Sequence, residues 1–416
     1  MQILVQKFGG TSVQNEKSRC HVLKHIKIAL SNNLKLVVVV SALGRSPDPY
    51  ATDTLLKLVN FPANYNSKRE LDLLMSCGET IASVVLSNEL QKNHIDAIAL
   101  TGSQAGFVTN MDYNRAKIKS VNPKRIQNEL RTRDVVVVAG FQGQTETGEI
   151  TTIGRGGSDT SAVALGAALD AERVEIFTDV NGIMTADPRV VKSAQPLDVV
   201  TYTEICNLAY QGAKVIHPRA VEIAMQAKIP IRVRSTYAQD GGTLVTGSRT
   251  KQFDQEISDR PVTGIAHMSS ITQLKVHTKE EAYRYQSEVF KSMADAGISV
   301  DFINISPTGV IYTVPNMLAN RAVEVLEMLG FHPEVTANCA KVSVVGAGMT
   351  GIPGIASQIV KALTNEGVQI LQSADSHTTI WVLIHEKDLI TAVNALHDVF
   401  KLSKINMKVQ DFIIER

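Results

Sequence analysis

The chain has 416 residues, of which 44% are apolar and 20% charged, a composition typical of a soluble globular protein with two or three domains. Lys+Arg (42) balance Asp+Glu (41), so the net charge of +1 gives no electrostatic basis for binding nucleic acid or an anionic membrane. We expect no membrane span and no signal peptide in this sequence. The four cysteines form no CxxC pair, so we expect neither a metal site nor a disulfide framework, and a cytoplasmic location fits.

Strands and helices alternate from residue 1 to about 245. Apolar, β-branched runs predict buried strands at Ile3–Val5, Leu36–Val40, Val135–Ala139 and Val174–Thr178. Helical patterns lie between them, for example at Glu70–Leu90 and Asp159–Leu169. This alternation is typical of an α/β domain with ligands at the carboxyl ends of parallel strands. A polar stretch at 238–261 begins with a Gly-Gly turn, and we place the domain boundary there.

The remainder of the chain contains an internal repeat. FKSMADAGISV begins at Phe290 and VKALTNEGVQI begins at Val360, which places Gly297 and Gly367 70 positions apart. The helical stretches from Arg321 and Thr391 show the same offset. The element order predicts two ferredoxin-like βαββαβ modules at 262–337 and 340–416, after a first domain at 1–245. A duplicated structural domain without a ligand is the alternative.

Three polar motifs carry the candidate chemistry, and the first and third of them follow predicted strands. Lys7-Phe8-Gly9-Gly10 combines a lysine with glycines whose backbone N–H groups can approach an anion. In the second motif, Gly154–Ser161, Arg155 has the planar fork that suits a carboxylate. Helix capping by Ser158 or Asp159 is the structural alternative there, although it does not explain the arginine. The third motif, Thr178–Arg189, would be an ordinary turn on its own.

Together these stretches resemble the aspartate kinase family. The resemblance rests on KFGGTSV from Lys7, SCGE ending at Glu79, GRGGSD from Gly154, TDVNGIMTADPRVV from Thr178 and GAKVIHP from Gly212. It covers essentially the whole chain and is strongest for the monofunctional Gram-positive type with two C-terminal ACT modules. It implies a three-layer amino-acid kinase fold with a mostly parallel central sheet, followed by the two ACT modules. It also implies transfer of the γ-phosphoryl group of ATP, with Mg²⁺, to the β-carboxylate of L-aspartate, the first step of lysine/diaminopimelate, threonine and methionine biosynthesis.

The resemblance also implies roles for individual residues. Lys7 and Asp159 match the catalytic positions. The positions that match substrate-binding residues are Thr52, Glu79, Arg155, Gly156, Gly157 and Ser158. The positions that match nucleotide-binding residues are Lys7, Phe8, Gly9, Gly10, Thr178, Asp179, Met184, Arg189, Lys214 and Val215. Many relatives have tyrosine where this chain has Met184.

These residue types suit aspartate chemically. Arg155 can bind one carboxylate of the substrate, and Glu79 can bind its ammonium group. The other carboxylate is the nucleophile, and with a pKa of about 3.9 it is already ionised at neutral pH, so no general base is required. Catalysis then depends on positioning and on neutralisation of charge by Lys7, backbone amides and Mg²⁺.

The ACT tail implies feedback inhibition by diaminopimelate, lysine or threonine, and a homodimer joined through these modules. The candidate effector-binding residues, chosen by their position around the repeated glycines, are Ser299, Asp301, Asn304, Gln369, Ile370 and Ser376. The D-[KR]-P-G turn of many relatives is missing, since His277–Gln286 reads HTKEEAYRYQ. This absence counts against concerted binding of lysine and threonine, and the overall resemblance to the Gram-positive type favours diaminopimelate as the effector.

Two other functions compete with this one: a kinase acting on another amino acid such as glutamate, and a catalytically silent amino-acid sensor. A GxGxxG pattern at Gly346–Gly351 would suggest a dinucleotide-binding fold. We reject that fold because only 65 residues follow Gly351, and because the repeat places this stretch inside the second module.

Overall fold

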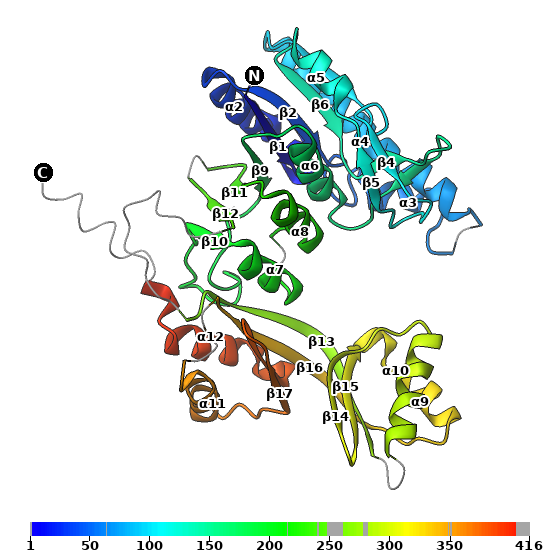
Figure 1. Cartoon of the computed structure of the whole chain (residues 1–416), viewed down its shortest axis with the longest axis vertical. Helices are drawn as coiled ribbons and strands as arrows, with labels where there is room; N and C mark the ends of the chain where they lie inside the picture. Colours follow the sequence, from blue (N-terminus) through cyan, green and yellow to red (C-terminus); the bar gives the residue numbers. More distant parts are fainter. Residues whose placement is uncertain are drawn as a thin grey trace, which may run out of the picture. The chain divides into compact units, whose positions relative to one another are not determined.

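The computed structural model describes residues 2–63, 65–213, 215–238, 241–247, 261–277, 282–347, 349 and 352–404. The chain divides into two compact units (Figure 1). The first unit contains Met1–Met184, Pro196–Ala209 and Lys214–Ile257, and the second contains Thr185–Gln195, Tyr210–Ala213 and Ser258–Arg416. Within the described residues, no helix has both the length and the apolar character needed to cross a bilayer.

An eight-stranded sheet forms the centre of the first unit, in the order β10-β12-β11-β9-β1-β2-β6-β3. All its pairs are parallel except β11 with β12. The strands are β1 (Ile3–Phe8), β2 (Lys35–Val40), β3 (Ala97–Leu100), β6 (Val135–Ala139), β9 (Arg173–Thr178), β10 (Val199–Thr201), β11 (Ile231–Ser235) and β12 (Thr243–Thr246). The four strands predicted from apolar runs lie within β1, β2, β6 and β9, which are neighbours in this sheet, so the predicted parallel α/β core is confirmed.

A smaller sheet and eight helices complete the first unit. The sheet has the order β5-β4-β7-β8, with β4 (Phe107–Thr109), β5 (Ile118–Val121), β7 (Gln142–Gln144) and β8 (Ile150–Thr152). The helices found among the described residues are α1 (Gly10–Val13), α2 (Glu16–Ser31), α3 (Thr52–Lys57), α4 (Lys68–Lys92), α5 (Lys124–Leu130), α6 (Gly157–Ala168), α7 (Tyr202–Tyr210) and α8 (Pro218–Ala227). A capping box between Ser67 and Glu70 fixes the start of α4.

Alternation along β1 decides which side chains reach the two faces of the large sheet. Leu4 and Phe8 belong to an apolar cluster with residues of α2 and α4. Lys7 directly precedes Phe8, and successive side chains of a strand point to opposite faces. The Lys7 side chain therefore points to the face where α6 packs against β1. The core thus fixes the direction of the lysine.

The second unit is built on one six-stranded antiparallel sheet in the order β14-β15-β13-β16-β18-β17. The strands are β13 (Gly264–His277), β14 (Asp301–Ser306), β15 (Gly309–Pro315), β16 (Glu334–Val345), β17 (Gln372–Asp375) and β18 (Thr379–His385). The helices are α9 (Ala282–Asp295), α10 (Asn316–Met328), α11 (Ile355–Asn365) and α12 (Leu389–Val399), with 3₁₀ turns η1 (Glu386–Asp388) and η2 (Leu402–Lys404). Figure 1 shows α9 and α10 beside β14 and β15, at one end of this sheet.

The two modules are nested rather than strictly consecutive. The second half of β13, from Ile271 onward, pairs with β15 and with the first half of β16. Its first half, 264–268, pairs with 341–345, which is the opening strand of the second module. Residues 264–268, at the start of the predicted first module, therefore occupy the outer strand position beside the opening strand of the second. The boundaries 262–337 and 340–416 stay a prediction, and the pairing adds that both modules share one continuous sheet.

Candidate active site

A cavity of about 500 Å³ lies at the carboxyl ends of β1, β2 and β6, where the loops after these strands meet the start of α6. This is the edge at which an α/β sheet is expected to bind ligands, and the volume suits a small molecule. Nine residues predicted to bind substrate or phosphate line it: Lys7, Gly10, Thr52, Glu79, Arg155, Gly156, Gly157, Ser158 and Asp159. Sequence segments up to about 150 residues apart are thus brought together as expected.

An ion pair joins the first strand to α6. The Lys7 Nζ lies 2.8 Å from Asp159 Oδ1, and each side chain is only 13% exposed. Asp159 lies in the first turn of α6, where the positive end of the helix dipole stabilises a carboxylate. The pair holds the lysine ammonium at the cavity wall, with further donor capacity for an incoming anion.

The arginine loop, Gly154–Gly157, depends on left-handed glycines. Gly154 has φ +84° and Gly156 has φ +67°, and a Cβ at Gly156 would lie 2.2 Å from the His217 side chain. Gly156 is the N-cap of α6 and no side chain caps this helix, so the capping alternative for Ser158 and Asp159 is wrong. The uncapped first turn leaves backbone donors at the cavity, where they can bind an anion.

Glu79 is a buried acid on α4, with 3% of its surface exposed. Its Oε1 accepts a hydrogen bond of 3.2 Å from the Ala42 N–H, whereas Oε2 is buried and has no partner among the described residues. Burial raises the pKa of this carboxyl to about 8, although its hydrogen bonds with backbone groups act in the opposite direction. A cationic group entering the cavity would favour the ionised form and satisfy the free oxygen.

Apolar side chains form much of the remaining wall, which is lined by Leu56, Phe61, Leu71, Met75 and Phe141. Such a wall lowers the local dielectric and strengthens the attraction between a bound charge and its partner. Among the described residues no group of three or more His, Cys, Asp or Glu side chains is arranged to hold a metal ion.

The residues predicted to bind nucleotide are more scattered. The side chain of Phe8 is fully buried and stacks on Phe177 at 4.5 Å, so only its backbone can meet a ligand. Gly9 lies near Lys7, since a Cβ there would be 3.6 Å from the ammonium. Thr178, Asp179, Met184 and Val215 are not among the residues that line the cavity, and Lys214 lies outside the described residues.

Arg189 belongs to a segment that packs within the second unit. This side chain is 81% exposed and pairs with Asp187. In the same unit, His397 of α12 is fully buried and its Nε2 lies 3.0 Å from the Thr185 hydroxyl. Asn394 of α12 donates to the Val190 carbonyl at 3.2 Å. The helix of the second module therefore holds both ends of the turn that carries Arg189.

The candidate effector residues surround the starts of corresponding strands in the second unit. Ser299 precedes β14, and Asp301 and Asn304 lie within it; Gln369 and Ile370 precede β17, and Ser376 follows it directly. Asp301 pairs with the nearly buried Lys341. Gln372 of β17 donates to the Phe302 carbonyl at 2.6 Å and accepts from Gln273 at 2.8 Å, so these buried side chains link β17 to β13 and β14.

The sequence motifs identified neither Asn114 nor Asp72. Asn114 lines the cavity, and the fully buried Asp72 lies behind it and accepts hydrogen bonds from the Asn114 backbone N–H. Asn114 lies in a loop without a recognisable motif. Asp72 gave a weak signal, because it falls on the same helical face as Met75 and Glu79, a face that is otherwise buried and mainly apolar.

Comparisons with known proteins agree with this architecture. The model of the amino acid kinase family matches residues 2–235, and that of the ACT domain matches residues 334–398. Aspartokinase 1 of Bacillus subtilis (strain 168) is 61% identical over 404 residues, which cover 97% of this chain and 100% of that protein. The aspartokinase of Geobacillus stearothermophilus is 39% identical over 410 residues, with 97% and 98% covered.

Solved structures give the same result. The crystal structure of E. coli aspartokinase III in complex with aspartate and ADP, in the R-state, aligns with a TM-score of 0.77 at 26% identity and covers 96% of this chain and 99% of that one. The complex of the same enzyme with lysine and aspartate, in the T-state, aligns with a TM-score of 0.75 at 26% identity, with 95% and 99% covered. The chain matches the amino acid kinase family model, and it is similar to these aspartokinases over almost their full length. The chain therefore belongs to the aspartokinase family of amino acid kinases.

Proposed function

We propose that this protein transfers the γ-phosphoryl group of MgATP to the β-carboxylate of L-aspartate and gives 4-phospho-L-aspartate. The observation that carries the proposal is one cavity lined by the Lys7–Asp159 pair, the arginine loop and the buried Glu79. The Bacillus subtilis relative is named an aspartokinase, and the E. coli structure contains aspartate and ADP, which supports the same substrates here.

The cavity offers a partner for each charged group of aspartate. Arg155, with Ser158, binds the α-carboxylate, and Glu79 binds the α-ammonium group. Thr52, at the start of α3, lies beside the substrate, while Gly156 and Gly157 let backbone donors approach it closely. The β-carboxylate then points to Lys7 and to the first turn of α6.

The reaction needs charge neutralisation more than proton transfer. An oxygen of the ionised β-carboxylate attacks the γ-phosphorus, forming a new O–P bond. The bond from that phosphorus to the bridging oxygen breaks, and ADP leaves with the electron pair. Lys7 neutralises charge on the transferring group, Asp159 orients this lysine, and the Mg²⁺ that enters with ATP neutralises the phosphates.

The nucleotide is proposed to lie beyond Lys7 along the exit of β9. Its proposed contacts come from the backbone around Phe8, Gly9 and Gly10, and from Thr178, Asp179, Met184 and Val215, which all belong to the first unit.

Acyl-phosphate formation, trapped with hydroxylamine as a hydroxamate, tests the proposal directly. With MgATP and matched concentrations of aspartate and glutamate, we expect product from aspartate and at least about tenfold less from glutamate, since an extra methylene displaces the carboxylate from Lys7. Efficient use of glutamate would favour the other amino-acid kinase. No product from either would favour the silent sensor.

Lys7→Ala and Arg155→Ala should change different kinetic parameters. Loss of the lysine should lower kcat by about 10²–10³-fold with little change in the KM for aspartate, because its charge acts on the transition state. Loss of the arginine should mainly raise that KM. Steady-state kinetics measure both, with the exposed Lys24→Ala on α2 as the control. Equal losses of kcat and affinity in both variants would contradict these separate roles.

Glu79 makes aspartate binding and stability depend on pH in opposite directions. With a folded pKa of about 8 against an ordinary 4.5, the ligand-free protein holds an extra proton between these values, so its stability falls as pH rises from 4.5 to 8. Aspartate affinity should rise over the same range, because the ammonium group requires the ionised acid.

Glu79→Gln separates these two effects. Relative to wild type, its free energy of unfolding should increase as pH rises toward 8, while its KM for aspartate should be about 10- to 100-fold higher. Urea denaturation and kinetics at pH 6, 7 and 8 measure both, with the exposed Glu16→Gln as the control. Unchanged stability and affinity at every pH would exclude this role.

The second unit is proposed to bind a feedback effector and to join two copies of the chain. The effector is diaminopimelate, lysine or threonine, with Ser299, Asp301, Asn304, Gln369, Ile370 and Ser376 as candidate contacts. The homodimer is supported by β14, which lies at the edge of the sheet and carries Ile303 and Ile305, 47% and 56% exposed. An edge strand with exposed apolar side chains favours association with another chain.

Sedimentation with and without each of the three amino acids should show a dimer, and calorimetry should identify the effector. Ile305→Lys should weaken the dimer, because it places a charge on the proposed interface. Ile28→Lys, at a similarly exposed isoleucine of α2, should leave it intact. A stable wild-type monomer under all conditions would refute the dimer.

A further inference from the structure

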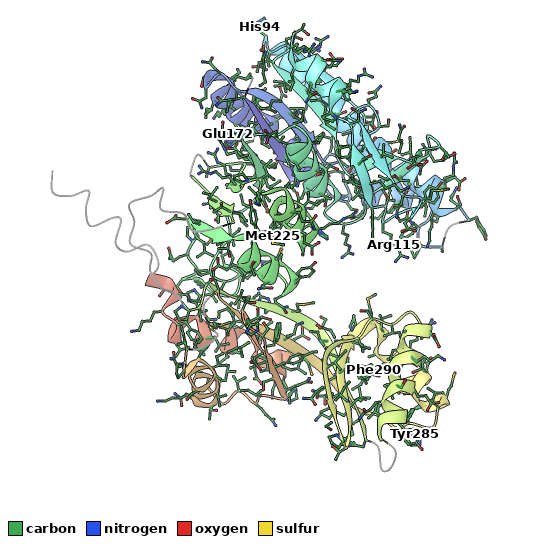
Figure 2. The ribbon with its side chains drawn as sticks, viewed as in Figure 1. His94, Arg115, Glu172, Met225, Tyr285 and Phe290 are labelled. Atoms are coloured by element: carbon green, nitrogen blue, oxygen red, sulfur yellow. The ribbon has the colours of Figure 1, made fainter. Side chains whose placement is uncertain are left out.

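Asn114 lines the cavity from the loop between β4 and β5, and no sequence motif assigns it a role. Its backbone N–H donates to both oxygens of Asp72 at 3.0 Å. The same carboxylate accepts from the Thr152 N–H at 2.8 Å and the Thr152 hydroxyl at 2.6 Å. Asp72 thus ties Asn114 to α4 and to the strand just before the arginine loop. Figure 2 labels Arg115, the next residue along this loop.

The Asn114 side chain has an unsatisfied acceptor. Its Oδ1 is buried and has no hydrogen-bond partner in the part of the chain that the structure describes. A buried carbonyl without a hydrogen-bond partner destabilises the ligand-free protein, so a ligand that brings a donor is favoured at this position. Glu79 lines the same cavity, and its Oε2 is likewise buried without a hydrogen-bond partner among the described residues. Two buried oxygens without hydrogen-bond donors at one cavity indicate a ligand group that carries several N–H donors.

The backbone geometry places Asn114 where such a group must lie. A Cβ on Gly154 would be 3.0 Å from the Asn114 carbonyl oxygen, so this residue lies against the turn that carries Arg155. The α-carboxylate and the α-ammonium group of an amino acid are attached to the same carbon. If Arg155 binds the first, the partners of the second must be its immediate neighbours, and Asn114 is one.

We propose that Asn114 Oδ1 accepts a hydrogen bond from the α-ammonium group of aspartate, alongside Glu79. The proposal rests on the proposed function, because it assumes that aspartate occupies this cavity. Glu79 supplies the opposite charge, and Asn114 supplies a neutral acceptor with a fixed direction. Asp72 is the positioning residue for this contact, since it fixes the Asn114 backbone without reaching the substrate.

The backbone also dictates the choice of variant. Asn114 has φ +69°, a left-handed conformation that asparagine tolerates and most residues do not. Asn114→Gly therefore removes the side chain and keeps the turn, and Asn114→Asp keeps an acceptor but removes the amide donor. Asn33→Gly is the matched control, because Asn33 is an exposed asparagine with φ +58° that does not line the cavity.

The test compares aspartate with succinate, which has both carboxylates but no amino group. The affinity for aspartate is measured from kinetics, and that for succinate from its competitive inhibition. Asn114→Gly should weaken aspartate about tenfold, the size expected for one hydrogen bond to a charged group, and leave succinate and ATP within about twofold. Asn114→Asp should retain the preference for aspartate. Urea denaturation checks that each variant is folded.

Two results would overturn the proposal. Equal weakening of aspartate and succinate by Asn114→Gly would mean that Asn114 only shapes the loop. Loss of aspartate binding in Asn114→Asp, with succinate equally affected, would mean that the amide donates to a carboxylate instead. Failure of the wild-type protein to phosphorylate aspartate would instead refute the proposed function, so the two failures can be told apart.

Discussion

The ion pair between Lys7 and Asp159 is the contact on which the site depends, because it joins the first strand of the sheet to the helix that starts at the arginine loop. Alternation along β1 buries Leu4 and Phe8 on one face and turns Lys7 to the other. The dipole of α6 stabilises the aspartate, and the low exposure of both groups keeps solvent from screening the pair. A cation is thereby held at the edge of the sheet where phosphate has to arrive.

Around this pair the cavity keeps polar groups that the folded protein alone does not satisfy. Glu79 is buried at a pKa of about 8, and Asn114 Oδ1 is buried without a partner among the described residues. Both conditions cost stability in the empty protein, and both are relieved by a ligand that brings an ammonium group. Selectivity for an amino acid can thus arise from the fold, since a dicarboxylate without the amino group leaves these acceptors unpaired.

The sequence predicts the parts of this structure that are encoded locally. Apolar runs indicated four adjacent central strands, and the motifs around Lys7, Glu79 and Arg155 identified most of the cavity wall. The contacts of Asp72 with Asn114 and Thr152 were not predictable, because they join residues 42 and 80 positions apart that carry no motif. Likewise, the offset of 70 residues predicted a duplication in the second unit, but it could not show that the two halves of β13 pair with different halves of β16.

A structure of the chain with aspartate and a non-hydrolysable ATP analogue tests the central claim most directly. We expect the β-carboxylate and the γ-phosphate to meet at Lys7 Nζ, with Arg155 on the α-carboxylate and Glu79 and Asn114 on the ammonium group. Aspartate bound elsewhere, or bound in this cavity with its β-carboxylate directed away from Lys7, would contradict it.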